Sequence, residues 1–355
     1  MWPTASSRRL DCAPQRGVGT QAWQGLLALI VTAALAAGCS TLGSTSAKPN
    51  PPSSPGATKK ALPCEAPTGV TNFLLRGGGA VHPVRIFVPS VATESASGSL
   101  PVVIDWPALG LTGAQQAAVT GYESLAQAQG FVVVHPTGAP SASTHQDSWQ
   151  LVKTYDPERD DVAFADTLIN TLIAHWCVDP RRVYSTGYSN GALFTARLVG
   201  DLAQRLAAAV MVAGVYHPAG CTPARAVPMV AYHGTADRTI PFNGGGRSLL
   251  AGSGWPGIRD FFYNVIPDEF AKFAKDFKCD RQPRVTRIGT DVIRQDYLGC
   301  ENGVPLSFFE VVGGGHTWPG SPLASILMPF GRTTETVNAT VDGWSFMKTK
   351  SLATK

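Results

Sequence analysis

The sequence predicts an α/β protein in which a mainly parallel sheet carries helices on both faces. Strand-like apolar runs alternate with helical stretches from residue 70 onward, as in repeated β-α-β units. The composition, with 44% hydrophobic and 15% charged residues, has too little charge for a disordered chain. About 290 residues can form one domain of this type, and we assign residues 63–350 to it.

The expected strands and helices follow from the periodicity of apolar residues and from the glycines and prolines between them. Val70–Arg76 and Val81–Pro89 flank three consecutive glycines, which predicts an opening hairpin. Gly113–Gln129 is expected to form a single helix that Gly130 closes. Further strands are expected at Pro101–Asp105, Phe131–His135, Arg182–Thr186, Ala208–Ala213, Pro228–His233, around Val285 and at Leu306–Val312, and further helices at Asp161–Trp176, from Ala192, near Asp268–Phe277 and at Glu335–Lys348.

The first 38 residues have the features of an export signal. Three arginines precede the apolar stretch 26–37, which has signal-peptide length and is too short to span a bilayer. The stretch leads into LAAGC, which resembles the bacterial lipobox, where the cysteine is acylated and the bond before it is cleaved. We therefore expect a signal peptide at 1–38 and lipidation at Cys39, with an ordinary cleaved signal as the alternative.

Residues 39–62 are expected to form the lipidated cysteine and a flexible tether. They contain four prolines and no aromatic residue, so they bury too little surface to offset the entropy of ordering. A diacylated cysteine supplies the two chains that stable membrane attachment requires. The predicted location is therefore extracytoplasmic, with the protein lipid-anchored to the cell membrane or secreted.

The charge distribution argues against a nucleic-acid partner. The net charge is +4, but three arginines and three lysines precede residue 63, so the predicted domain is close to neutral. Proteins that bind nucleic acid by charge present a basic patch. We expect a neutral or weakly charged partner, bound without nucleic acid.

The cysteines indicate disulfides and no zinc site. Cys279 and Cys300 bracket two short strand-like segments and are expected to pair, because export implies an oxidising compartment. No pair of cysteines has the CxxC spacing that is typical of zinc ligands, so no metal site is predicted.

The candidate nucleophile is Ser189, in the GxSxG pentapeptide at residues 187–191. The motif directly follows the apolar strand 182–186 and directly precedes the helical run from Ala192. Strand, sharp turn and helix form the nucleophile elbow, which exposes a serine held in a strained conformation.

The candidate base and acid follow from the chain order Ser, Asp, His of such sites. His217 comes too early, and His233, at the end of an apolar strand, is expected to be structural and buried. His316 lies in a glycine-rich loop after a strand and is the expected base. Asp237, four residues past the strand that ends at His233, is the expected acid. The competing carboxylates Asp291, Asp296 and Glu310 lie in or beside strand-like segments.

An acyl-transfer site also needs two N–H donors for the oxyanion. One is expected from Asn190, the residue after the nucleophile. The second is expected from the loop after the first core strand, where Pro107 has no N–H to donate. Trp106, Ala108 and Leu109 remain open as candidates.

Several segments together resemble the secreted polyhydroxybutyrate-depolymerase-like esterases, a group that includes feruloyl and acetylxylan esterases and lipoproteins. The resemblance implies an α/β-hydrolase fold and a triad on Ser189, Asp237 and His316. It also implies that Cys64 pairs with Cys221 and that Cys177 is free. The matching segments are GFVVVHP at 130–136, DDVAF at 160–164, VDPRRVY at 178–184 running into GYSNG, HGTAD at 233–237 and GGGHTWPG at 313–320.

The chain departs from this family in the loop after the first core strand. Where family members usually read His-Gly, or sometimes His-Trp, this chain has Asp105-Trp106-Pro107. Loss of one oxyanion donor typically lowers turnover by about 10² to 10³. A carboxylate at Asp105 would also disfavour an oxyanion unless its side chain points away or pairs with a base.

The predicted function is that of a lipid-anchored serine esterase that acts without a cofactor on small or oligomeric esters. Its substrates would be short hydroxyalkanoate, aryl or acetyl esters. One alternative is a feruloyl or acetylxylan esterase acting on plant polysaccharide esters, and another is a catalytically impaired binding lipoprotein of the cell envelope. Trp149 and Trp318 are expected to line the substrate cleft, with core packing as the alternative, and residues 247–265 to form a lid or a plain surface loop.

Overall fold

The computed structural model describes residues 66–90, 99–142, 145–151, 158–218, 221–245, 264–321, 323 and 330–353, all in one compact unit of the chain. The expected signal peptide and tether, with Cys39 and Cys64, lie outside the described residues, as does most of the segment 247–265. Within the described ranges, no helix has the length and apolar character needed to cross a bilayer.

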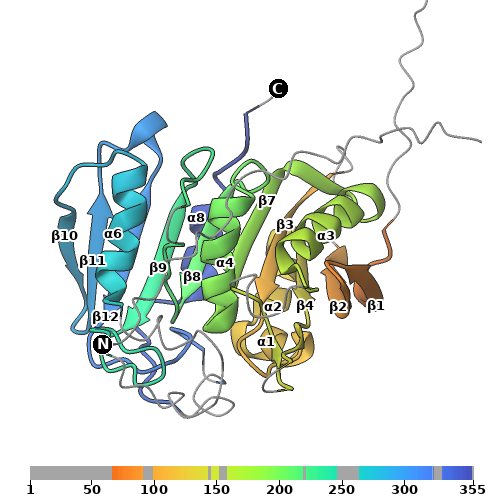
Figure 1. Ribbon diagram of the computed structural model, residues 1–355, viewed down its shortest axis with the longest axis horizontal. Helices are drawn as coiled ribbons and strands as arrows, with labels where there is room; N and C mark the ends of the chain where they lie inside the picture. Colours follow the sequence, from red (N-terminus) through yellow and green to blue (C-terminus); the bar gives the residue numbers. More distant parts are fainter. Residues whose placement is uncertain are drawn as a thin grey trace, which may run out of the picture. The chain divides into compact units, whose positions relative to one another are not determined.

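A ten-stranded sheet runs through the unit in the order β1-β2-β4-β3-β7-β8-β9-β12-β11-β10 (Figure 1). Neighbouring strands from β4 to β12 in this order are parallel, whereas β2 and β11 pair antiparallel with both of their neighbours. The predicted mainly parallel sheet is confirmed. The strands are β1 Gly69–Gly77, β2 Ala80–Val88, β3 Leu100–Trp106, β4 Val132–Pro136, β7 Val178–Tyr188, β8 Ala208–Val212, β9 Met229–Gly234, β10 Arg284–Ile288, β11 Val292–Tyr297 and β12 Leu306–Val311, with a separate small hairpin of β5 Ala139–Pro140 and β6 Asp147–Ser148.

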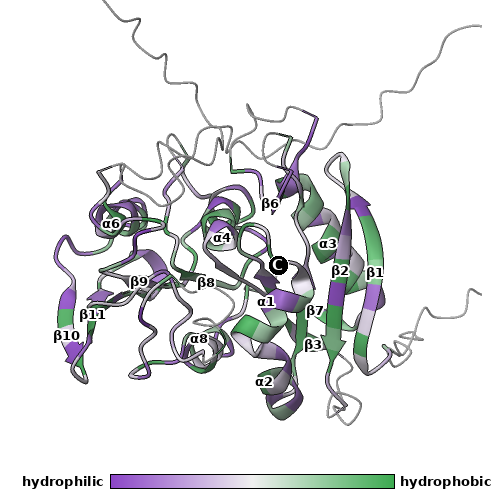
Figure 2. Ribbon diagram, turned by 90° about the horizontal axis from the view of Figure 1, so that it is seen from below, coloured by the Kyte–Doolittle hydropathy of each residue, from purple (hydrophilic) through white to green (hydrophobic). Residues whose placement is uncertain are grey.

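Helices cover both faces of the sheet because successive strand residues point to opposite sides. Val102 and Ile104 of β3 pack into the core beneath α3, α4 and α6, whereas Val103 packs on the side of α1, α2 and α8 (Figure 2). These central strands are buried on both faces and are therefore almost continuously apolar. The helices are α1 Gly113–Thr120, α2 Tyr122–Gln129, α3 Asp161–His175, α4 Asn190–Asp201, α6 Ile266–Asp276 and α8 Ala339–Met347, with a short 3₁₀ turn η3 at Glu301–Gly303.

The order of the strands changes direction at β3, inside the sheet. The chain leaves β3 through α1 and α2 to reach β4 on one side, and later returns to β7 on the other side of β3. The loops after β3 and β7 therefore diverge at a topological switch point, where open α/β sheets bind their ligands. This order, with a GxSxG turn after β7, is that of the α/β-hydrolase fold.

Two helices differ from the sequence-based expectation. The helix expected at Gly113–Gln129 is divided by Gly121, whose left-handed backbone (φ 68°) ends α1 and starts α2. Glycine adopts this conformation without a steric penalty, so it closes one helix as readily as it continues a loop. The last helix begins at Ala339 rather than near Glu335, because Asn338 caps it by accepting the N–H groups of Thr340 and Val341.

The disulfide prediction is confirmed for one pair and wrong for Cys177. Cys279 and Cys300 form the expected bridge between the end of α6 and the end of β11. Cys177, expected to be free, is disulfide-bonded, as is Cys221. Only the likeness to relatives had indicated a free thiol at Cys177, and a family resemblance does not determine whether a particular cysteine has a partner in the fold. Because Cys64 lies outside the described residues, its pairing with Cys221 stays a prediction.

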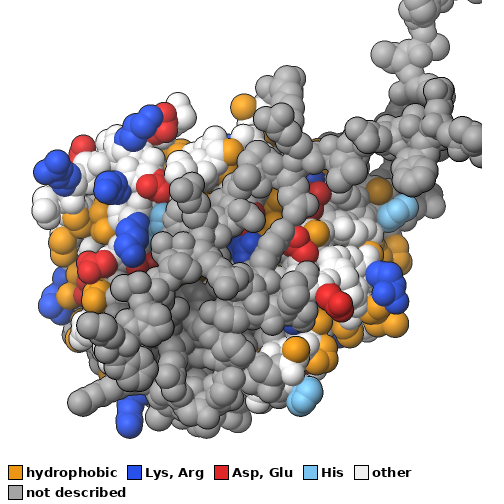
Figure 3. Space-filling model, viewed as in Figure 1, with side chains coloured by type: hydrophobic (Ala, Val, Ile, Leu, Met, Phe, Trp, Pro, Cys, Tyr) orange, Lys and Arg blue, Asp and Glu red, His pale blue; other side chains and the backbone are white. Residues whose placement is uncertain are grey.

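Charged side chains of both signs are interspersed on the described surface that Figure 3 shows. No single-sign field dominates that face among the described residues, in keeping with the near-neutral composition of the domain. Charge in the interior is instead paired. Arg159, 6% exposed, donates to both carboxylate oxygens of Asp161 and to the carbonyls of Ala139 and Ser148. It thereby joins the start of α3 to the β5–β6 hairpin.

Replacement of Arg159 by Met should lower the free energy of unfolding by about 3–5 kcal/mol, because it leaves the buried Asp161 carboxylate without its charged partner. Arg205→Met is the matched control, since Arg205 pairs with Asp166 at a site where both side chains are partly exposed. Its expected loss is about 0–1 kcal/mol. Urea unfolding of both variants measures the difference, and equal losses would contradict it.

Candidate active site

Ser189 occupies a sharp turn between β7 and α4. Its backbone lies at φ 55° and ψ −116°, a sparsely populated region for a residue with a side chain. Its N–H donates to the Val212 carbonyl (2.9 Å) and its carbonyl accepts from the Leu193 N–H (3.0 Å). The strained turn is thus held by the neighbouring strand on one side and by the helix on the other, as in a nucleophile elbow.

Glycines around Ser189 allow the backbone segments to approach closely. A Cβ atom at position 191 would lie 1.9 Å from the Trp106 carbonyl oxygen and 2.7 Å from that of Pro107. A Cβ atom at position 187 would lie 2.3 Å from the Gly191 carbonyl oxygen. Because no side chain fits at either position, Gly187 lets the turn close on itself and Gly191 lets the elbow pack against the loop after β3.

The structure brings the three predicted residues into one hydrogen-bonded chain. Nε2 of His316 lies 2.8 Å from the Ser189 hydroxyl, and Nδ1 of His316 lies 2.7 Å from Oδ2 of Asp237. A carboxylate can only accept, so Nδ1 carries the proton and Nε2 accepts from the serine. The residues follow β7, β9 and β12, which end at the same edge of the sheet, and each is at most 5% exposed.

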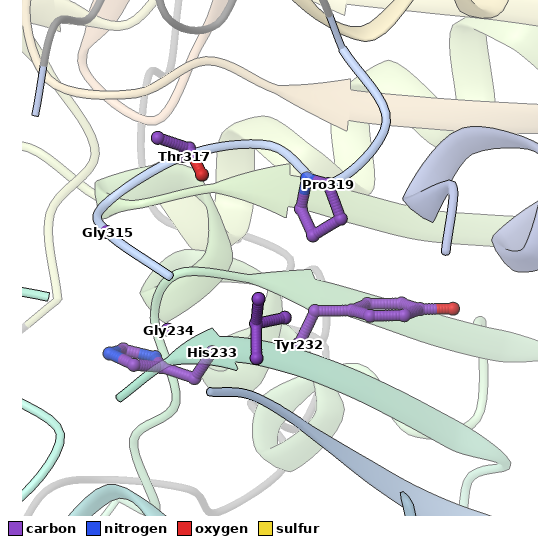
Figure 4. Close-up of a pocket in the computed structure, with 7 residues that line it drawn as sticks. Tyr232, His233, Gly234, Gly315, Thr317 and Pro319 are labelled. Carbon is purple, nitrogen blue, oxygen red and sulfur yellow. The ribbon is translucent and has the colours of Figure 1, made fainter. Parts of the chain in front are cut away.

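The loops that carry Asp237 and His316 are bonded to each other. The Ala236 N–H donates to the Gly314 carbonyl (2.9 Å), and a Cβ atom on Gly234 would lie 2.3 Å from the same oxygen. Figure 4 shows the recess that these segments line, with His233 and Gly234 at the end of β9 and Gly315, Thr317 and Pro319 in the loop after β12. The close contact sets the separation of acid and base.

Tyr188, the last residue of β7, helps to position His316. Its hydroxyl donates to the His316 carbonyl (2.6 Å), and its ring stacks on the imidazole with centroids 5.4 Å apart. Burial, with a smaller contribution from the charge of Asp237, raises the pKa of the Tyr188 phenol well above its ordinary value, so the phenol remains neutral.

The Asp237 carboxylate is buried but saturated with donors. Oδ1 accepts the N–H groups of Thr239 (2.8 Å) and Ile240 (2.9 Å), and Oδ2 faces the rings of His316 and His233. Burial alone would raise the pKa of the Asp237 carboxyl, but His316, followed by His233, outweighs burial and holds that pKa well below its usual range. The acid therefore stays ionised where it can stabilise an imidazolium.

The predicted oxyanion donors are placed as follows. Asn190 is the first residue of α4, so its N–H has no partner within the helix and lies at the positive end of the helix dipole. Its side chain is engaged elsewhere, because it accepts from the Trp149 N–H (2.7 Å) and donates to the Trp149 carbonyl (3.2 Å). In the loop after β3, the Ala108 N–H donates to the Gln116 side chain (3.3 Å). Trp106 and Leu109 stay open as second donors.

Asp105 points into a buried polar cluster on the α1 side of the sheet. Its carboxylate accepts from Gln116 Nε2 (2.9 Å) and Thr120 Oγ1 (2.8 Å) and lies 3.1 Å from Nδ1 of His135. From the sequence, a carboxylate at Asp105 would disfavour an oxyanion unless its side chain pointed away or paired with a base. The contact with His135 meets the second of these conditions. Sequence reasoning missed these partners, although Gln116 and Thr120 lie four residues apart on one helix face.

The expectation that Trp149 and Trp318 line the cleft is wrong, and the core-packing alternative describes both rings. Trp149 is 2% exposed, stacks on Phe194 and donates its indole N–H to the Pro107 carbonyl. Trp318 is fully buried and donates to Thr340. Both indoles find apolar neighbours and a hydrogen-bond acceptor inside the domain, which removes any need for solvent contact. The Trp106 indole is buried in the same way and donates to Ser185.

No family model matches the chain. Feruloyl esterase B of Piromyces equi is 27% identical over 164 residues, which cover 45% of this chain and 29% of that protein. The bifunctional acetylxylan esterase/xylanase XynS20E of Neocallimastix patriciarum is 26% identical over 251 residues, 69% of this chain and 32% of that protein. Probable acetylxylan esterase A of Aspergillus fumigatus is 32% identical over 155 residues, 43% and 38% of the two chains.

The chain is a relative of the feruloyl and acetylxylan esterases. It spans about a third of the length of the first two relatives, with 29% and 32% of them covered. A solved acetyl xylan esterase from Aspergillus awamori superposes with a TM-score of 0.47 at 17% identity, covering 66% of this chain and 89% of that one. For this chain, an activity like that of polyhydroxybutyrate depolymerases stays a prediction.

Gly191→Ala should lower the free energy of unfolding of this protein by about 1–3 kcal/mol or more, because the added methyl overlaps the Trp106 and Pro107 carbonyls. Gly343→Ala is the control, since its added methyl would have 3.2 Å or more to its neighbours inside α8. The control should remain within about 1 kcal/mol of the wild type. Thermal and urea unfolding compare the two, and similar stabilities would show that the elbow does not need a glycine.

Asp237→Asn should lower the free energy of unfolding at neutral pH, and this difference from the wild type should become smaller in acid. A carboxyl whose folded pKa is depressed contributes stability above its unfolded pKa of about 4, and that contribution falls as the pH drops toward the folded pKa. The difference in unfolding free energy between wild type and variant should therefore narrow below about pH 4. Urea unfolding at a series of pH values measures it, and a constant difference would refute the ionised state of Asp237.

Proposed function

We propose that this protein is a serine carboxylic ester hydrolase that acts through an acyl-enzyme. The observation that carries the proposal is the continuous hydrogen-bonded chain from Ser189 through His316 to Asp237, set on an elbow at the switch point of the sheet. The names of the relatives support the same chemistry, since they describe esterases.

The geometry is suited to two matched half-reactions. In the first, Ser189 Oγ bonds to the ester carbonyl carbon while Nε2 of His316 takes the hydroxyl proton, and Asp237 stabilises the imidazolium. The Asn190 N–H donates to the oxyanion. Collapse of the tetrahedral intermediate breaks the bond to the alcohol oxygen, which receives the proton from His316. In the second, His316 takes a proton from the water that attacks the acyl-serine. Collapse of this second tetrahedral intermediate breaks the bond to Ser189 Oγ, which receives the proton from His316 as the acid is released.

For the substrate, we place acetyl and aryl esters of plant polysaccharides first and short hydroxyalkanoate esters second. The acetylxylan and feruloyl esterases among the relatives support the first class. The near-neutral domain also accords with an uncharged ester.

We further propose that the protein works outside the cytoplasm, anchored by an acylated Cys39. Support comes from the apolar stretch and lipobox-like LAAGC of the sequence. The Cys279–Cys300 bridge adds to it, because disulfides persist in oxidising compartments.

Ser189→Ala should lower the hydrolysis of p-nitrophenyl acetate, p-nitrophenyl butyrate and methyl ferulate by at least about a thousandfold, because it removes the attacking oxygen. Ser307→Ala is the matched control: this serine is also buried but bonds to Asp296, in a different part of the sheet. The control should retain turnover. A folded wild type that neither hydrolyses these esters nor is labelled at Ser189 by an alkyl phosphonate would favour the binding lipoprotein instead.

A further inference from the structure

A second histidine contacts the carboxylate of the triad. His233 lies near the end of β9, and its side chain is fully buried. Its Nε2 is 2.9 Å from the Ile240 carbonyl oxygen and 3.2 Å from Oδ2 of Asp237. Both oxygens can only accept hydrogen bonds, so Nε2 carries the ring proton, which it shares between the nearer Ile240 carbonyl and the more distant Oδ2 of Asp237. Nδ1 is buried and, among the described residues, has no hydrogen-bond partner.

With His233, the donor set of Asp237 is complete. An ionised carboxylate has about four acceptor positions. Oδ1 uses its two for the N–H groups of Thr239 and Ile240, and Oδ2 uses its two for His316 and His233. Ile240 takes part twice, through its N–H to Asp237 and its carbonyl to His233. His233 therefore ties the acid to the loop that carries it.

We propose that His233 is a positioning residue that lowers the basicity of the Asp237–His316 pair, by donating to the carboxylate oxygen that also holds His316. The proposal rests on the esterase function above and deepens it. Both rings contact Oδ2 of Asp237. The hydrogen bond from His233 therefore reduces the negative charge on this oxygen and makes it a weaker acceptor for His316. The imidazolium of His316 is then held less tightly and releases its proton more readily to the leaving alcohol.

Among the residues that the structure describes around His233, Asp237 is its charged partner. On the adjacent strand β12, Glu310 is in register with His233, but its carboxylate is hydrogen-bonded to Gln295 of β11. Burial raises the pKa of Glu310, and the bond from Gln295 opposes that rise. The Phe242 ring packs at 6.1 Å from the His233 ring and adds no charge. Tyr188, the other polar ring near Asp237, is a neutral phenol.

Replacement of His233 tests the proposal in the full-length protein. His233→Leu removes the donor and should lower kcat on methyl ferulate, whose alcohol needs the proton from His316 to leave, about tenfold, the usual scale for a hydrogen bond to a charged group. KM should stay unchanged, because His233 does not touch substrate. The acid limb of kcat/KM should move to higher pH, since Asp237 then holds the imidazolium proton more tightly. His233→Gln, which retains a donor of similar length, should return the acid limb toward its wild-type position.

A second readout does not depend on turnover. The Nδ1 proton of His316, identified by its absence in His316→Ala, should resonate at lower field in His233→Leu than in the wild type, because its acceptor has become stronger. An acid limb and a resonance that both stay at their wild-type positions in a folded His233→Leu protein would overturn the proposal and leave His233 a packing residue. If His233→Leu does not fold, the pH profiles of His233→Gln and of the shorter His233→Asn are compared instead. Acid limbs of kcat/KM at the same pH in these two variants would overturn the proposal.

These outcomes are separable from failure of the esterase proposal. A wild type without ester hydrolysis or Ser189 labelling would refute the function, while the His316 resonance would still report whether His233 acts on Asp237.

Discussion

The strained backbone of Ser189 is the feature on which the rest of this site depends. A side-chain-bearing residue at φ 55° and ψ −116° is unfavourable by itself, and it persists only because surrounding structure fixes it. Here the constraint comes from β8 and α4, which bind its N–H and carbonyl, and from glycines that let the β3 loop approach. Because the sheet and the helix are rigid, the serine hydroxyl meets His316 without any further adjustment.

Buried charge is the second organising constraint, and three described carboxylates illustrate how polar neighbours surround it. Asp237 is surrounded by two amides and two imidazoles, Asp105 by Gln116, Thr120 and His135, and Asp161 by Arg159. An unpaired carboxylate in such places would be strongly destabilising, whereas a paired one fixes the loop that carries it. The cluster at Asp105 lies at the end of β3, and the cluster at Asp237 lies in the loop after β9. Polar burial in this protein therefore positions the chemistry, in addition to the apolar core that stabilises the sheet.

Local sequence signals determined the fold class and the triad. Apolar runs separated by helical stretches imply a parallel sheet, because parallel strands need long crossover connections. The strand-GxSxG-helix context implies an elbow, and the order of Ser189, Asp237 and His316 restricts the partners to loops at one sheet edge. The chain nevertheless gave no local indication that Gly121 ends a helix, since a single glycine is compatible with both a helix interior and a left-handed cap.

Only the tertiary structure decided which polar and aromatic side chains meet. The packing of Trp149 on Phe194, the bond from Trp318 to Thr340 and the pairing of Asp105 with His135 each join residues from different elements. An aromatic residue has the same local signature whether it covers a cleft or fills a core, and a buried histidine has the same signature whether or not a carboxylate lies beside it. The sequence by itself therefore determined the elements and the reacting groups, while the packing of one element on another determined their environment.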